Sequence, residues 1–251
     1  MNAVLLTLFL IGIIIFLILL IVGRRKIIRH SGFVAVFFLF YFVDNLTIAL
    51  TNHFPELQFV PNHVWNEFLV CGWSGKLYSI LITLSLLYIF RSLLSLNEVG
   101  ITLHQGKGSF IPSVGIIMAI GFWSYFTGSR SPQGNFDIAT LTYLSVLPGL
   151  NEELVYRGVL PVCLGRLFPN NWSLASTKVG WSIIITTILF GLLHGLWVDD
   201  HFKVHIEIIW VRNAFLSGFI FAWLRERTGS LFMPIVAHGV WDFFLFLPRM
   251  I

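Results

Sequence analysis

Long apolar stretches separated by short polar connections make up most of the chain. A helix that crosses a membrane needs about 20 consecutive apolar residues. Eight stretches approach that length: residues 3–22, 32–50, 73–95, 110–128, 138–165, 180–197, 204–224 and 231–248. The pattern predicts an all-α membrane protein, a polytopic bundle of about eight transmembrane helices.

Composition supports this class of protein. Hydrophobic residues form 57% of the 251 positions and charged residues 11%, whereas soluble domains carry roughly 25% charged residues. The first stretch does not read as a cleavable signal peptide, because it lacks a basic start, its apolar core is too long and its positive charges follow it. Cys71 and Cys163 have no metal-type spacing, and we expect both to be packing residues.

Charges between the stretches predict an orientation, since cytoplasmic loops carry an excess of Lys and Arg. Arg24, Arg25, Lys26 and Arg29 follow the first stretch, which places that loop in the cytoplasm and the N-terminus outside. The loop at 51–72 contains Glu56 and Glu67 but no Lys or Arg, and we expect it outside. The remaining basic residues that fall on the predicted cytoplasmic side are Arg91, Lys107, Arg166, Lys178, Arg225 and Arg227.

The net charge of +4 is explained by these loops. No basic cluster interleaved with aromatic residues indicates nucleic-acid binding. We therefore expect a multi-pass integral membrane protein, in the plasma or inner membrane of a prokaryote or the endoplasmic reticulum of a eukaryote. The sequence does not indicate its oligomeric state.

Three polar groups interrupt the apolar C-terminal half, each on a different stretch. They are Glu152-Glu153-Leu154-Val155-Tyr156-Arg157, then Phe190-Gly191-Leu192-Leu193-His194, then His238-Gly239-Val240-Trp241-Asp242. Ionisable side chains at membrane depth are costly, and a functional site is the default explanation. Groups on separate helices can converge inside a bundle.

Helix geometry distinguishes the two adjacent glutamates. Glu153 and Arg157 are four residues apart and share a helix face, which predicts a structural ion pair. Glu152 points about 100° away and is left as a free carboxylate, the better candidate for a general base. His238 and Asp242, also four apart, present an imidazole and a carboxyl on one face. The Pro148-Gly149 pair just upstream could bend or open the helix.

The reaction that fits these groups is hydrolysis of a peptide bond by an activated water. Glu152 and His194 would take the proton of the water, while His238, helped by Asp242, would stabilise the oxyanion. A shared site requires Glu152 to lie within about 10 Å of His194 or His238. His194 lies near the outer end of its stretch and Glu152 in the middle of its own, so the sixth stretch must sit deeper or tilt.

At these residues the chain resembles the CAAX protease and bacteriocin-processing family, intramembrane glutamate proteases related to type II CAAX prenyl endopeptidases. The family pattern of Glu-Glu-x-x-x-Arg, Phe-x-x-x-His and His-x-x-x-Asn or Asp is present in order over about 148–245. The resemblance implies that Glu152 and His194 activate the water and that His238 and Asp242 line the oxyanion site.

The characterised prenyl endopeptidases have Asn at the last position, where this chain has Asp242. Because an ionised carboxylate would repel the oxyanion, we expect Asp242 to orient His238. The implied substrate is a membrane-embedded or lipid-anchored peptide or protein cut near its terminus, whether prenylated or not. We expect no cofactor and no metal. In this scheme residues 1–135 are N-terminal helices of unassigned role, and 136–251 form the catalytic core of one integrated membrane domain.

Other readings remain open. Gly72-Trp73-Ser74-Gly75, with His238, could form a rhomboid-like Ser-His dyad. Two histidines and a glutamate can bind zinc, although His-Glu-x-x-His is absent. A cation could also bind Asp199-Asp200-His201 with His205, although a solvated loop explains that cluster.

A non-enzymatic alternative is a membrane immunity or scaffold protein whose buried charges and histidines only tie helices together. Three groups on separate stretches argue against a purely structural role. Glu207 and Arg212 add two polar groups to the seventh stretch, and they either line the cavity or pair with other helices.

Overall fold

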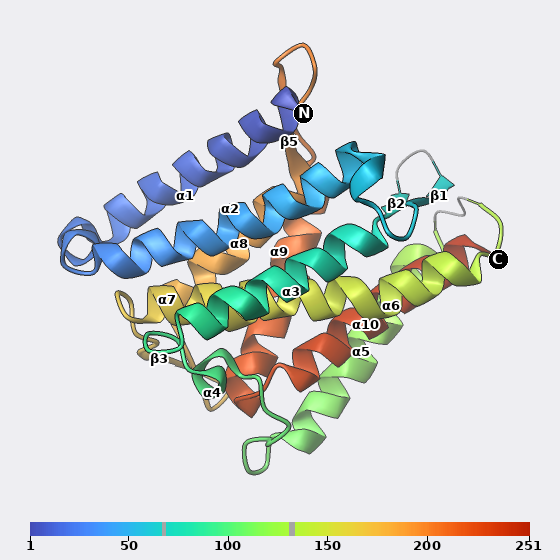
Figure 1. Cartoon of the computed structure of the whole chain (residues 1–251). Coiled ribbons are helices and arrows are strands. Elements are labelled where there is room, and N and C mark those ends of the chain that lie inside the picture. Colours follow the sequence, from blue (N-terminus) through green and yellow to red (C-terminus); the bar gives the residue numbers. More distant parts are fainter. Residues whose placement is uncertain (67–68, 131–133) are drawn as a thin grey trace.

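The computed structural model describes residues 1–66, 69–130 and 134–251 and shows a bundle of helices with short hairpins at its ends (Figure 1). The helices are α1 (Asn2–Arg29), α2 (Ser31–His53), α3 (Trp73–Ile89), α4 (Leu96–Val99), α5 (Phe110–Gly128), α6 (Ile138–Glu153), α7 (Leu160–Gly165), α8 (Trp181–Gly195), α9 (Ile208–Thr228) and α10 (Phe232–Phe246). A π-helical turn, η2 (Leu154–Val159), joins α6 to α7, and 3-10 turns occupy η1 (Pro55–Leu57) and η3 (Leu247–Arg249). Antiparallel hairpins pair β1 (His63–Asn66) with β2 (Leu69–Cys71), β3 (Trp172–Leu174) with β4 (Thr177–Val179) and β5 (Leu196–Val198) with β6 (Val204–Ile206).

Each predicted apolar stretch contains a helix, and a helical membrane protein is confirmed. Within the described residues, α1, α2, α5 and α9 are long and apolar enough to cross a membrane by length and composition. The apolar helices α3 and α8 are shorter. The number of eight crossings therefore stays a prediction. So does the division at residue 135.

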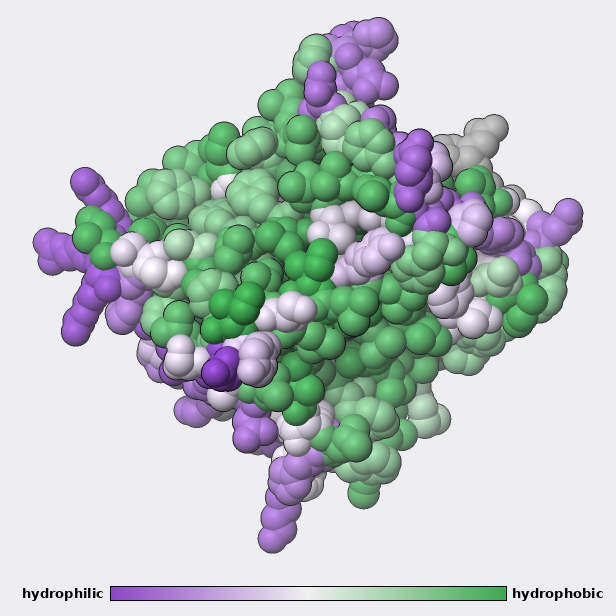
Figure 2. All heavy atoms as spheres, in the orientation of Figure 1, coloured by the Kyte–Doolittle hydropathy of each residue, from purple (hydrophilic) through white to green (hydrophobic). Residues whose placement is uncertain are grey.

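Helices α1 and α2 form a hairpin with His30 alone between them. The buried side of α1 follows a helical spacing of three or four: Leu8, Ile11, Ile15 and Leu19. The Tyr41 hydroxyl of α2 donates to the Leu8 carbonyl at 2.9 Å and fixes the two helices together. Phe9 and Ile13, on the outer side, are each 56% exposed, and this flank of the molecule is strongly hydrophobic (Figure 2). Its chemistry suits contact with lipid.

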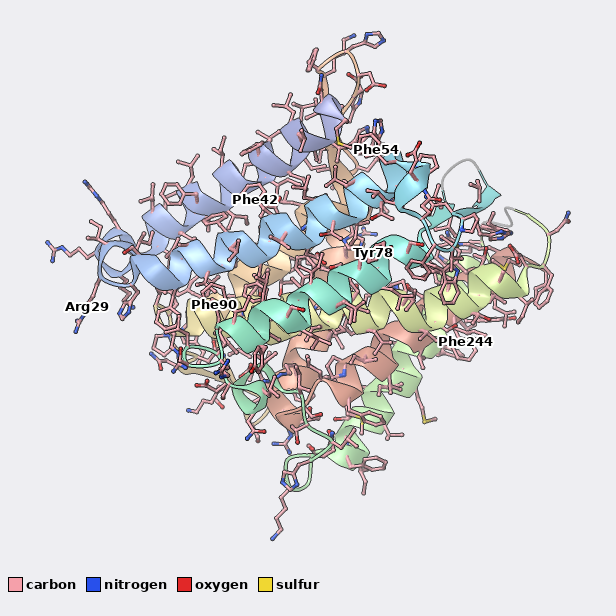
Figure 3. The ribbon with its side chains drawn as sticks, viewed as in Figure 1. Arg29, Phe42, Phe54, Tyr78, Phe90 and Phe244 are labelled. Carbon is pink, nitrogen blue, oxygen red and sulfur yellow. The ribbon has the colours of Figure 1, made fainter. Side chains whose placement is uncertain are left out.

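Basic residues gather at one end of the bundle, where the α1–α2 turn carries Arg29 (Figure 3). There, Glu98 of α4 lies 2.5 Å from Arg166, and Arg225 of α9 donates to the Glu98 carbonyl at 2.6 Å. Hydrogen bonds from Ser95, together with Arg166, lower the pKa of the Glu98 carboxyl. This end of the bundle is basic, and its cytoplasmic location stays a prediction. Glu67, which with Glu56 was used to predict that the 51–72 loop is outside, is not among the described residues.

Helices α6 and α10 approach closely because two glycines lie at their contact. A Cβ atom at Gly239 would stand 2.3 Å from the Ser145 carbonyl oxygen, and one at Gly149 would stand 3.1 Å from the Ile235 oxygen. Helix α6 continues through Pro148 as far as Glu153, and the wider π turn begins only after the glutamates. The helix therefore opens on the far side of the acidic pair, and Gly149 serves close packing.

Substituting Gly239 should loosen this contact. Gly239→Ala places a methyl group against backbone that cannot move freely, and we expect a loss of about 1–3 kcal/mol of stability. Gly115→Ala in α5 is the control, since nothing lies within 4 Å of an added Cβ there and Ala favours helix. Thermal unfolding in detergent measures both. Equal midpoints for the two variants would contradict the close approach.

Candidate active site

Glu152 lies where α6 gives way to η2, and its side chain is 15% exposed. Its Oε1 accepts a hydrogen bond from Lys76 Nζ at 2.7 Å. Its Oε2 has no hydrogen-bond partner among the described residues, and lies 3.8 Å from His194 Nε2 and 3.9 Å from His238 Nε2. One carboxylate oxygen is held and the other faces two imidazoles. The three residues meet the distance condition for a shared site.

His194 is fixed by its own helix. Its Nδ1 lies 2.8 Å from the carbonyl oxygen of Phe190. A carbonyl can only accept, so Nδ1 carries the proton and Nε2 is directed at Glu152. Helix α8 ends one residue later, at Gly195, beside the middle of the continuous α6–η2–α7 run. This early end brings His194 to the depth of Glu152.

His238 is held by a residue other than the expected one. Its Nδ1 lies 2.7 Å from Glu153 Oε1, whereas Asp242 Oδ2 lies 3.5 Å from Nε2. We expected Asp242 to orient this ring. Instead, the close approach of α6 and α10 sets Glu153 against Nδ1, and Asp242, one turn further along α10, lies on the side of the ring that faces Glu152.

The predicted Glu153–Arg157 ion pair is present. Arg157 Nη1 lies 3.0 Å from Glu153 Oε1, and the two side chains are 2% and 0% exposed. The Arg157 guanidinium also lies 3.9 Å from the centroid of the Phe190 ring, a cation–π contact. The same ring is 4.3 Å from that of His194. Phe190 therefore packs against both the cation and the histidine.

The N-terminal helices contribute polar groups that the sequence analysis did not single out. Lys76 of α3 contacts Glu152 and also donates to Asn151 Oδ1 at 3.0 Å. Asp44 of α2, which is buried, accepts from Asn151 Nδ2 at 2.9 Å, from Ser79 and from the Tyr156 hydroxyl at 3.3 Å. Lys76 and Asp44 are isolated charges in apolar stretches, and such charges indicate a functional site just as the two glutamates do.

A cavity of about 630 Å³ adjoins these groups. Its lining includes Glu152, His194, Lys76 and Asp44, and its walls come from α1, α2, α8 and β5. His238 and Asp242 are not part of the lining. The cavity therefore reaches the Glu152–His194 side of the cluster, and both halves of the chain enclose it.

The other candidate groups are placed elsewhere. Ser74 makes its hydrogen bonds, within the described chain, to both backbone groups of Val60 at 2.9 Å, which ties a loop to the start of α3. Glu207 and Arg212 are exposed and do not line the cavity. Asp199 lies 2.8 Å from His205 across the β5–β6 hairpin, and this hydrogen bond lowers the pKa of Asp199.

Neither a metal cluster nor a disulfide is formed by the described residues. They contain no group of three or more His, Cys, Asp or Glu side chains placed to hold a metal ion. At Glu152 the Lys76 ammonium group already occupies one carboxylate oxygen. Cys71 and Cys163 are buried free thiols, as expected of packing residues.

Comparison with known families bears on this constellation. Residues 134–244 match the family of type II CAAX prenyl endopeptidase Rce1-like proteins. This part of the chain belongs to the CAAX protease family. Membership implies a hydrolase that cleaves peptide bonds in a membrane setting. No curated protein and no solved structure gave a significant match.

The CAAX protease segment contains Glu152, Glu153, Arg157, His194, His238 and Asp242. Lys76 and Asp44 lie before it, on α3 and α2. The cluster around Glu152 is therefore assembled from the family segment together with helices that precede it.

Removing Arg157 should unbalance the buried charge. Arg157→Met leaves the Glu153 carboxylate without its cation, and breaking a buried pair costs about 3–5 kcal/mol. The double variant Arg157→Met with Glu153→Gln should recover part of that loss in chemical unfolding. Arg212→Met, at an exposed site, is the control and should change little. A single variant as stable as the control would show that the pair does not stabilise the bundle.

Proposed function

We propose that the protein is an intramembrane endopeptidase in which Glu152 activates the attacking water. The observation that carries the proposal is the position of Glu152 Oε2, unpartnered among the described residues and 3.8 and 3.9 Å from the two histidine Nε2 atoms. These separations exceed direct hydrogen bonds of about 2.7–3.2 Å. They suit one bridging water.

The chemistry follows from this placement. The water gives a proton to Glu152 while its oxygen bonds to the carbonyl carbon, and the carbonyl electron pair moves to oxygen to form the tetrahedral oxyanion. His194 Nε2 accepts the second water hydrogen and aims the attacking lone pair. When the carbon–nitrogen bond breaks, Glu152 returns its proton to the leaving amine.

His238 is the proposed oxyanion donor. With Nδ1 bound to Glu153, it can donate from Nε2 only as the doubly protonated imidazolium. Glu153, bound to Nδ1, supplies negative charge next to that imidazolium and orients the ring. In this account Asp242, 3.5 Å from Nε2, is a neutral carboxylic acid and does not repel the oxyanion.

Lys76 is a proposed positioning residue. It binds Glu152 Oε1 at 2.7 Å and, through Asn151, joins the Asp44 network. Fixing one oxygen leaves the other aimed at the histidines. Small displacements of a base lower the rate steeply. Since Lys76 holds Glu152 in position, the helix that carries Lys76 contributes to catalysis.

The cavity suits a peptide presented from the membrane. Its lining includes Val4 near the start of α1 and His53 at the end of α2, at the end of the hairpin away from Arg29, where Phe54 lies (Figure 3). If the basic end is cytoplasmic, the substrate enters from the opposite side. The proposed substrate is a membrane-embedded or lipid-anchored peptide or protein, cut near its terminus. A substrate held in the membrane could approach the apolar flanks of the bundle directly.

Glu152→Gln should reduce peptide cleavage severely. Loss of the base lowers kcat by about 10²–10⁴-fold, and His194→Ala should have a comparable effect. The assay uses purified protein in proteoliposomes with a lipidated peptide library. Glu56→Gln, on the exposed turn η1, makes the same chemical change and should keep wild-type activity. An active Glu152→Gln would overturn the mechanism, and activity lost in Ser74→Ala at the same time would indicate a serine nucleophile.

Lys76→Met should lower kcat by about 10- to 100-fold with little change in KM, because the base loses its alignment. Lys76→Arg should retain part of the activity, since it keeps a cation at the same place. Lys178→Met, at an exposed position, is the matched control. If Lys76→Met only reduces the folded fraction, and kcat per folded molecule is unchanged, Lys76 is structural.

A further inference from the structure

The strand β5 follows the candidate site without interruption. His194 and Gly195 end α8, and Leu196–Val198 continue as β5. All three strand residues line the cavity that also contains Glu152 and His194. A substrate that enters this cavity therefore meets β5 next to Glu152.

The ladder of the hairpin shows which backbone groups of β5 are free. Glu207 N–H donates to the Gly195 carbonyl at 2.7 Å and Asp199 N–H to the Lys203 carbonyl at 3.0 Å. Hydrogen-bonded pairs alternate along an antiparallel ladder, so Trp197 pairs with His205. The N–H and carbonyl groups of Val198 point away from β6, as does the Leu196 carbonyl.

This outer edge faces α1. Val198 N–H donates to the Thr7 hydroxyl at 2.8 Å, and the same hydroxyl donates to the Ala3 carbonyl at 2.9 Å. Thr7 also lines the cavity. The carbonyls of Leu196 and Val198 have no hydrogen-bond partner among the described residues.

From these contacts we infer that the outer edge of β5 binds the substrate backbone as an added strand, with the Thr7 hydroxyl occupying the place of a substrate carbonyl when the site is empty. The ligand is an extended peptide segment adjoining the scissile bond. Strand addition of this kind draws affinity from main-chain hydrogen bonds. The inference rests on the proposed peptidase function, and it identifies α1 as the element that must yield when a substrate enters.

The test uses full-length protein in proteoliposomes and a peptide that the wild type cleaves. Val198→Pro removes the inferred donor without touching the ladder to β6, and KM should rise about 2- to 10-fold, the value of one hydrogen bond. Val204→Pro is the matched control, because its N–H also points away from the partner strand but lies on the opposite, exposed edge. It should leave KM unchanged. Thr7→Val, which frees the Val198 N–H, should hold or lower KM.

A scan of the peptide with N-methylated amides supplies the second readout, which does not depend on how the variants fold. Strand addition predicts sensitivity at alternate positions beside the cleaved bond, a period of two. Equal KM for the two proline variants, or a scan without alternation, would overturn the inference while leaving the peptidase function standing. A wild-type protein that cleaves no peptide would remove the function and the inference with it.

Discussion

Two neighbouring carboxylates deep in an apolar bundle must each be matched by a positive charge, and this requirement governs how the helices assemble. Burying a charge without a partner is strongly unfavourable. Glu152 is matched by Lys76 at 2.7 Å and Glu153 by Arg157 at 3.0 Å. The first partner comes from a distant helix and the second from the next turn of the same run. The cation that matches Glu152 therefore depends on tertiary structure, while the cation that matches Glu153 comes from its own helical run.

The two ion pairs leave different carboxylate oxygens free for other contacts. Glu153 uses Oε1 for both Arg157 and His238, so it joins the ion pair to the imidazole on α10. Glu152 commits only Oε1. Asp44 adds a further buried carboxylate. Neutral donors bind it, and Asn151 connects it to Lys76. The result is a continuous polar path through α2, α3, α6 and α10 within an otherwise apolar interior.

Much of this arrangement follows from local sequence. Apolar length predicted the positions of the helices, and a spacing of four residues predicted that Glu153 would meet Arg157. The partner of His238 could not be derived in the same way, because it depends on how closely α6 and α10 approach at Gly149 and Gly239. Leu196 to Val198 are apolar, so hydropathy placed them within or beside a helical stretch and did not distinguish a strand. Lys76 was accessible to the same argument as the glutamates, but it lay outside the recognised motifs.

The π turn η2, from Leu154 to Val159, divides one helical run into two parts, α6 and α7. In an uninterrupted α-helix, each added residue rotates everything beyond it by about 100°, so the faces of α6 and α7 would be locked together. A wide turn absorbs part of that rotation. Helix α6 can then keep its face towards α3 and α10 while α7 presents a different face to α2 and α8. The π turn therefore lets the helical faces of α6 and α7 be set separately. A change in how α7 packs near Cys163 need not rotate Glu152 and Glu153 away from their partners.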